Sequence, residues 1–184
     1  MSVTLKQVEA IPATYPAVTG LSVAAVALDP AMIWQRIESY IAYRWTARAV
    51  VWTVEGSGEW TAPLTPATLT TVEVWDGAAW VEAFPVASPL GGYDLAACGP
   101  YRITATVGSG TPPAAVLEAF RRLAEYSVEV RKDGMVSGHP SHTSHSTDIG
   151  DAIKESYTRS ANWTARAMQL SGAADLLRPY RRAQ

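Results

Sequence analysis

Three histidines spaced three residues apart, His139, His142 and His145, are the residue types in this sequence best suited to binding a metal. Three imidazoles that leave a fourth position open are a common zinc arrangement. However, Pro140 interrupts helical geometry, no carboxylate is adjacent, and serine and threonine dominate the segment. We therefore expect a flexible loop here, with no bound metal and no other cofactor.

Three other features could carry chemistry, and each has a simpler interpretation. A hydrolytic triad could combine one of many serines with His142 and Asp148, but no Gly-x-Ser-x-Gly elbow presents a nucleophile. Residues 108–110 (GSG) precede a helix as a phosphate loop does, yet no lysine follows, and Pro112-Pro113 removes two N–H donors. Cys98 is the only cysteine and is interpreted as a small apolar residue. We predict that the protein is not an enzyme.

The elements that must position these residues begin with a helix expected at 29–46. Asp29 suits an N-cap and Pro30 the first helical position, because the missing N–H of proline is not needed there. Apolar side chains then recur at helical spacing and form one stripe. The same periodicity predicts a second helix at 112–131 and further helices within 151–177.

Residues 48–107 change from helical to strand-like patterns. The segments 50–54, 70–75, 80–84 and 101–107 are rich in β-branched and aromatic residues. Asp76-Gly77 gives a turn signal, because both residue types tolerate positive φ. This part of the chain predicts a small antiparallel sheet inserted between the helices.

Composition limits the remaining possibilities. The chain has 184 residues, of which 48% are hydrophobic and 17% charged, below the ~25% charged residues of soluble domains. A surface poor in charge is typical of a protein that partners cover. Residues 1–100 hold four Lys and Arg against nine Asp and Glu, and residues 101–184 hold eleven against eight. The net charge of −2 predicts no general affinity for nucleic acid, and no apolar run is long enough to cross a membrane.

Three segments resemble the head–tail connectors, or neck adaptors, of long-tailed phages and phage-like gene transfer agents. They are IWQRIESYI at 33–41 with the following 45–52, GPYRITATVG at 99–108 with the helix start at 112–113, and SGAADLLRPYRR at 171–182. The resemblance covers residues 29–182, and the C-terminal peptide is its most specific part. The sequence departs from the usual family start, because residues 1–28 show no clear further helix.

The resemblance implies an α+β fold that is mainly helical, a small helical bundle with an inserted antiparallel β-sheet. We expect an extended N-terminal arm at 1–28, a single connector domain at 29–178 and a C-terminal tail at 179–184. Within the connector domain, a mobile loop is expected at 132–150.

The resemblance also implies a structural role in the neck of a virion or phage-like particle, made in the bacterial host cytoplasm. Such adaptors form a ring, usually a dodecamer, that joins the portal protein to a tail-side stopper or tail terminator. DNA passes through the lumen without sequence-specific binding, and no membrane takes part. The portal-binding candidates are Leu176, Leu177, Arg178, Tyr180, Arg181 and Arg182. Leucine and tyrosine would supply buried anchors, and arginine bidentate contacts to acidic groups.

Two other functions fit parts of the sequence. Seven tryptophans, several of them in the predicted sheet, could form a non-catalytic module that binds single-stranded nucleic acid or a surface ligand. An enzyme that uses the histidine-rich loop is the other alternative.

Overall fold

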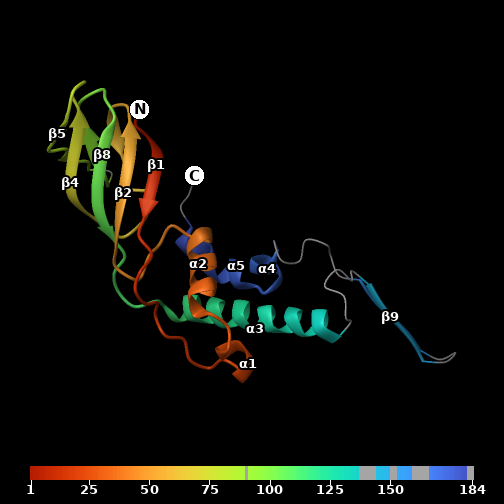
Figure 1. The fold of residues 1–184 in the computed structure, drawn as a ribbon. Helices are drawn as coiled ribbons and strands as arrows, with labels where there is room; N and C mark the ends of the chain where they lie inside the picture. Colours follow the sequence, from red (N-terminus) through yellow and green to blue (C-terminus); the bar gives the residue numbers. More distant parts are fainter. Residues whose placement is uncertain (90, 137–143, 150–152, 159–165, 182–184) are drawn as a thin grey trace. The chain divides into compact units, whose positions relative to one another are not determined.

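The computed structural model of the chain describes residues 1–89, 91–136, 144–149, 153–158 and 166–181 (Figure 1). The chain forms two compact units, each built from segments far apart in the sequence. The first unit comprises Met1–Pro16, Glu38–Pro112 and Tyr180–Gln184, and the second comprises Ala17–Ile37 and Pro113–Pro179. The expected connector domain at 29–178 therefore includes parts of both units.

A five-stranded antiparallel sheet with the order β1-β2-β8-β4-β5 is the main element of the first unit (Figure 1). Its strands are β1 (Val3–Glu9), β2 (Arg48–Glu55), β8 (Tyr101–Val107), β4 (Ala67–Trp75) and β5 (Trp80–Glu82). Alternation along β8 buries Ile103, Ala105 and Val107 on one face. The antiparallel pairing expected between the helices is thus confirmed, and β1 adds a strand to it.

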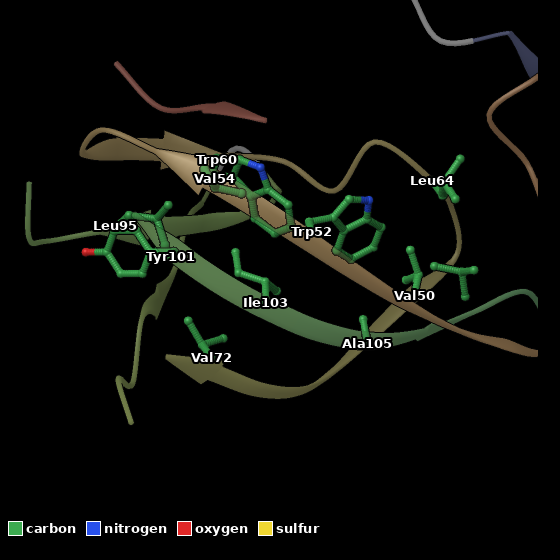
Figure 2. Close-up of a cluster of buried hydrophobic side chains, with 11 residues drawn as sticks. Val50, Trp52, Val54, Trp60, Leu64, Val72, Leu95, Tyr101, Ile103 and Ala105 are labelled. Atoms are coloured by element: carbon green, nitrogen blue, oxygen red, sulfur yellow. The ribbon is translucent and has the colours of Figure 1, made fainter. Parts of the chain in front are cut away.

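A three-stranded sheet completes the core of the first unit. It has the order β3-β7-β6, with β3 (Gly58–Trp60), β7 (Tyr93–Leu95) and β6 (Val86–Ala87). Figure 2 shows Trp60 beside Trp52, and their ring centroids lie 5.5 Å apart. Leu95 is buried in the same cluster. Burying side chains of this size stabilises a fold by about 1.5–3 kcal/mol each, so these tryptophans are core residues.

Two polar side chains of strand β1 bond to buried indoles, while its apolar side chains are exposed. The Trp60 indole N–H donates a hydrogen bond to Thr4 Oγ1 at 2.9 Å, and the Trp52 indole N–H donates to Gln7 Oε1 at 2.8 Å. A buried indole N–H needs such a partner. Thr4 and Glu9 are half-buried, whereas Val3, Leu5, Lys6, Gln7 and Val8 are exposed.

The second unit contains several helices in addition to the strand pair β9 (Ser144–Ile149) and β10 (Ile153–Thr158). The helices are α1 (Val23–Val26), most of α2 (Pro30–Tyr40), α3 (Ala114–Val136), α4 (Ala167–Leu170) and α5 (Ala173–Leu177). Asp29 Oδ1 accepts a hydrogen bond from the Ala31 N–H at 2.9 Å, so the predicted start of the first helix is confirmed. Trp34 of α2 and Phe120 of α3 lie 5.2 Å apart between ring centroids. No described helix has a stretch long and apolar enough to cross a membrane.

Helix α2 ends at Tyr40, six residues before the expected end at 46. The Arg44 N–H donates to the Thr65 carbonyl at 2.8 Å, and the Thr65 N–H donates to the Ala42 carbonyl at 3.0 Å. The backbone of Ala42 and Arg44 is therefore hydrogen-bonded to Thr65, about twenty residues further along the chain, and does not continue the helix. Such long-range bonds leave no trace in local periodicity.

The expectation of a mainly helical fold is wrong. The fold is mixed α+β with two antiparallel sheets of five and three strands, and strands make up 30% of it. Part of the expected arm at 1–28 is strand β1. Part of the expected helical range 151–177 is β10 (Ile153–Thr158), which pairs with β9 (Ser144–Ile149) inside the expected loop. Tyrosine, threonine and isoleucine in that segment also favour strands. The spacing of its apolar residues therefore did not distinguish a helix from a strand.

Two glycines that follow β8 give a matched test of backbone packing. Gly108 and Gly110 have φ of +93° and +82°, but a Cβ at Gly108 would overlap the Thr46 carbonyl, whereas a Cβ at Gly110 meets nothing within 4 Å. Both alanine substitutions add the same backbone strain. We expect Gly108→Ala to lower the free energy of unfolding by about 2 kcal/mol more than Gly110→Ala, measured by urea denaturation. Equal losses would contradict this packing.

Candidate functional site

The first part of the predicted portal-binding segment lies in α5 and the 3-10 helix η2 (Arg178–Tyr180). Leu177 is fully buried, so its side chain stabilises its own unit in this structure. Leu176 is half-buried, and Arg178 is exposed. Of these three residues, Arg178 is the one most accessible to a partner.

An aromatic cluster of Tyr43, Trp45 and Tyr180 holds the next part of the segment in the first unit. The Tyr180 ring centroid lies 5.6 Å from that of Trp45 and 6.2 Å from that of Tyr43, both in edge-to-face geometry. The Ala42 N–H also donates to the Tyr180 carbonyl at 3.2 Å. Both ring and backbone of Tyr180 are therefore fixed.

Arg181 follows this anchor and is exposed. Its guanidinium carbon lies 4.8 Å from the ring centroid of Tyr40, a cation–π distance. Stacking leaves the edge of a guanidinium free to bind carboxylates. Arg182, the last predicted contact residue, lies outside the described residues.

Three buried charged residues and the half-buried Glu9 form a network in the first unit that the sequence analysis did not predict. Arg48 binds Glu38 through two hydrogen bonds of 2.7 and 2.6 Å, and it reaches Glu9 at 3.3 Å. Arg44 binds the same Glu9 carboxylate at 2.6 and 3.1 Å. The network therefore joins the end of β1, the end of α2 and the start of β2.

The Arg48–Glu38 pair is the most deeply buried part of this network, with side-chain exposures of 3% and 7%. Burial alone would lower the pKa of Arg48, but its hydrogen bonds to Glu38 and the charges of Glu38 and Glu9 outweigh this effect, and the pKa is raised. Arg48 also lies 5.6 Å from the ring centroid of Tyr15. A charged residue on the apolar side of the first helix, Glu38, was the one available sequence signal.

The other surface aromatic group lies on the β4–β5 hairpin. Trp75 and Trp80 lie 5.5 Å apart between ring centroids, and the Arg102 guanidinium carbon lies 4.8 Å from the Trp80 centroid. Glu73 accepts two hydrogen bonds from Arg102 at 2.6 and 2.7 Å, and these lower the pKa of the Glu73 carboxyl. In the turn, backbone N–H groups of Ala79 and Ala78 lower the pKa of Asp76 in the same direction.

Large exposed apolar side chains gather at both edges of the five-stranded sheet. On and next to β1 they are Met1, Val3, Leu5, Val8 and Ile11; on and just after β5 they are Val81 and Phe84. Scattered apolar residues are normal on a protein surface, but a contiguous group of them is typical of an interaction site.

The remaining candidate residues do not form a site in the described ranges. No group of three or more His, Cys, Asp or Glu there could hold a metal ion; His139 and His142 lie outside those ranges, and His145 is in β9. The Gly108 N–H donates to the Pro66 carbonyl at 2.9 Å and the Ser109 N–H to the Arg44 carbonyl at 3.3 Å. Two donors that a phosphate loop would need are therefore bonded within the chain.

The buried network gives a prediction on stability. Glu38→Gln leaves Arg48 buried without its full counter-charge, and we expect it to lower the free energy of unfolding by about 3 kcal/mol. The matched control is Glu118→Gln, which breaks the surface ion pairs with Arg121 and Arg122 on α3 at a residue whose side chain is 41% exposed; it should lower stability far less. Urea denaturation measures both, and similar losses would show that the network is not a major stabilising element.

Comparison of this chain with family models, with curated proteins and with solved structures gave no match. The grounds for assigning a function are therefore its own residues. Chief among them are the anchored C-terminal segment with Arg178 and Arg181, and the two apolar sheet edges.

Proposed function

We propose that this protein is a structural adaptor of a phage or phage-like particle. Copies would form a ring around the DNA exit channel and join the portal protein to a tail-side stopper or tail terminator. The observation that carries the proposal is the C-terminal segment. Leu177 is buried in one unit and Tyr180 is fixed in the other, and between and after them Arg178 and Arg181 stay exposed.

An anchored segment of this kind suits docking to a large partner. Because the ring and backbone of Tyr180 are held within the first unit, binding through this part of the segment costs less entropy. Exposed arginines can then make bidentate, charge-assisted bonds to acidic groups of the portal. Repeating the same modest contact around a ring gives strong attachment without a strong single site. The likeness of residues 171–182 to adaptor C-termini supports the same function.

The two apolar edges of the sheet also favour assembly over catalysis or transient binding. In a single copy, Val8 and Phe84 are exposed by 54% and 84%. A ring would cover such side chains between neighbouring copies. The low share of charged residues, 17%, agrees with a surface that is largely covered by partners.

The alternative function, a nucleic-acid-binding module on a tryptophan-rich sheet, has less support. Trp34, Trp45, Trp52 and Trp60 are buried, which leaves the Trp75–Trp80 pair as the described aromatic surface. The same hairpin carries Glu73, Asp76 and Glu82, whose charges repel phosphate. Oligonucleotide binding with a steep dependence on salt would favour the alternative.

Reversal of the exposed arginines tests the adaptor function. We expect the double variant Arg178→Glu, Arg181→Glu to bind the portal protein of the same particle at least about 100-fold more weakly, because each charge-assisted contact contributes about 1.5–3 kcal/mol. Biolayer interferometry on immobilised portal measures the affinity, and circular dichroism shows that the variant is folded.

The matched control is Arg131→Glu, a charge reversal at an exposed residue of α3. It should leave portal binding unchanged. Unaltered binding of the double variant, or the same loss in the control, would contradict the role of the C-terminal arginines. Substituting Leu177 is a poorer test, because truncating a fully buried leucine lowers stability by about 2–5 kcal/mol.

A further inference from the structure

We infer that neighbouring copies of this chain join edge to edge, with β1 of one copy beside β5 of the next. This inference rests on the proposed ring and names the surface that forms it. β1 and β5 are the two edges of one sheet, and neither pairs with a further strand in the described part of the chain. Open edges with exposed backbone groups are templates for pairing with another chain.

The two edges differ in the protection that natural sheets usually give an edge, because β5 has only three residues whereas β1 has seven. On β1, Val3, Leu5 and Val8 are more than half exposed; on the β5 side, Val81 and Phe84 are exposed by 45% and 84%. Edge strands that stay unpaired in solution normally carry several charges, a proline or a very short length. β1 has one register shift, between Thr4 and Lys6, and two charged side chains, Lys6 and Glu9; Glu9 is already bonded to Arg44 and Arg48.

Hydrogen bonds to the core of the same copy keep the apolar side chains of β1 exposed. Thr4 and Gln7 are hydrogen-bonded to the buried indoles of Trp60 and Trp52, so β1 cannot shift its register by one residue without losing these bonds. The apolar side chains are thus held in solvent until another surface covers them.

The charges of Lys6 on β1 and Glu82 on β5 favour contact between these two different edges. Lys6 lies among the apolar residues of β1, and Glu82 lies between Val81 and Ala83 on the other edge; neither has an ion-pair partner among the described residues. The cross-strand neighbour of Glu82 is Glu73, another acid, and Arg102 already makes two bonds to Glu73. Each edge therefore offers one unpaired charge, and the two are opposite in sign.

A head-to-tail contact satisfies both charges, whereas a symmetric one does not. Two β1 edges placed together would bring two Lys6 side chains close, and two β5 edges would do the same with Glu82; like charges across strands are destabilising. Because the sheet is antiparallel throughout, β1 and β5 run in the same direction. Copies in one orientation can therefore repeat the contact, which closes into a ring or continues as a filament.

A charge exchange tests this interface. We expect Lys6→Glu and Glu82→Lys each to raise the apparent dissociation constant of self-assembly at least about tenfold, because each places like charges at the contact. The double variant restores the opposite pair and should assemble like the wild type. Asp94→Lys, a reversal at an exposed residue of β7, is the control and should change nothing. Size-exclusion chromatography with light scattering, at several protein concentrations, measures assembly.

Three results would overturn the interface: single variants that assemble normally, a double variant that stays impaired, or a wild-type chain that is monomeric both alone and with portal. Portal binding by the wild type separates these from the proposed function. Portal binding with no effect of the charge exchange removes the interface and leaves the adaptor function. Charge-dependent assembly with no portal binding supports the interface and removes the adaptor function.

Discussion

The buried charges of Glu38, Arg44 and Arg48, together with the half-buried Glu9, are the constraint on which the first unit depends. Ionised groups can be buried only if their partners are complete, because removing one partner leaves a desolvated charge. Here the arginines are also bonded to main-chain carbonyls: Arg44 to those of Ile41 and Tyr43, Arg48 to that of Thr46. Three segments that are distant in sequence therefore have one mutual arrangement that satisfies all four groups.

Two surface features follow from that arrangement. Glu9 fixes the end of β1, so the strand keeps the register in which Thr4 and Gln7 bond to buried indoles and its apolar side chains face solvent. Arg44 fixes the segment after α2, whose backbone pairs with Thr65. On that same segment lie the aromatic rings that hold Tyr180. The apolar edge and the anchored C-terminus thus share one structural support.

Local patterns predicted the elements that local forces determine. The capped start of α2, the apolar stripe of α3 and the alternation of β8 were all predictable from spacing. The missed features depend on distant partners. The exposure of the β1 apolar side chains depends on the indoles that Thr4 and Gln7 contact. Helix α2 ends where the following backbone bonds to Thr65. Glu38 binds Arg48, which lies beyond the end of that helix. The C-terminal residues could be named in advance, but the burial of Leu177 could not.

The exposure of the β1 apolar side chains is hard to explain for a chain that acts alone. A strand could bury Val3, Leu5 and Val8 against the core and leave its polar side chains in water, and each exposed apolar side chain forgoes about 1.5–3 kcal/mol of burial. In this chain, Thr4 and Gln7 accept the hydrogen bonds of two buried tryptophans, while the apolar side chains of the strand stay exposed. A single copy is therefore less stable than it could be, because the apolar side chains of β1 stay exposed. A neighbouring copy can cover them. This arrangement is advantageous only if the neighbour is regularly present, as it is in a closed ring.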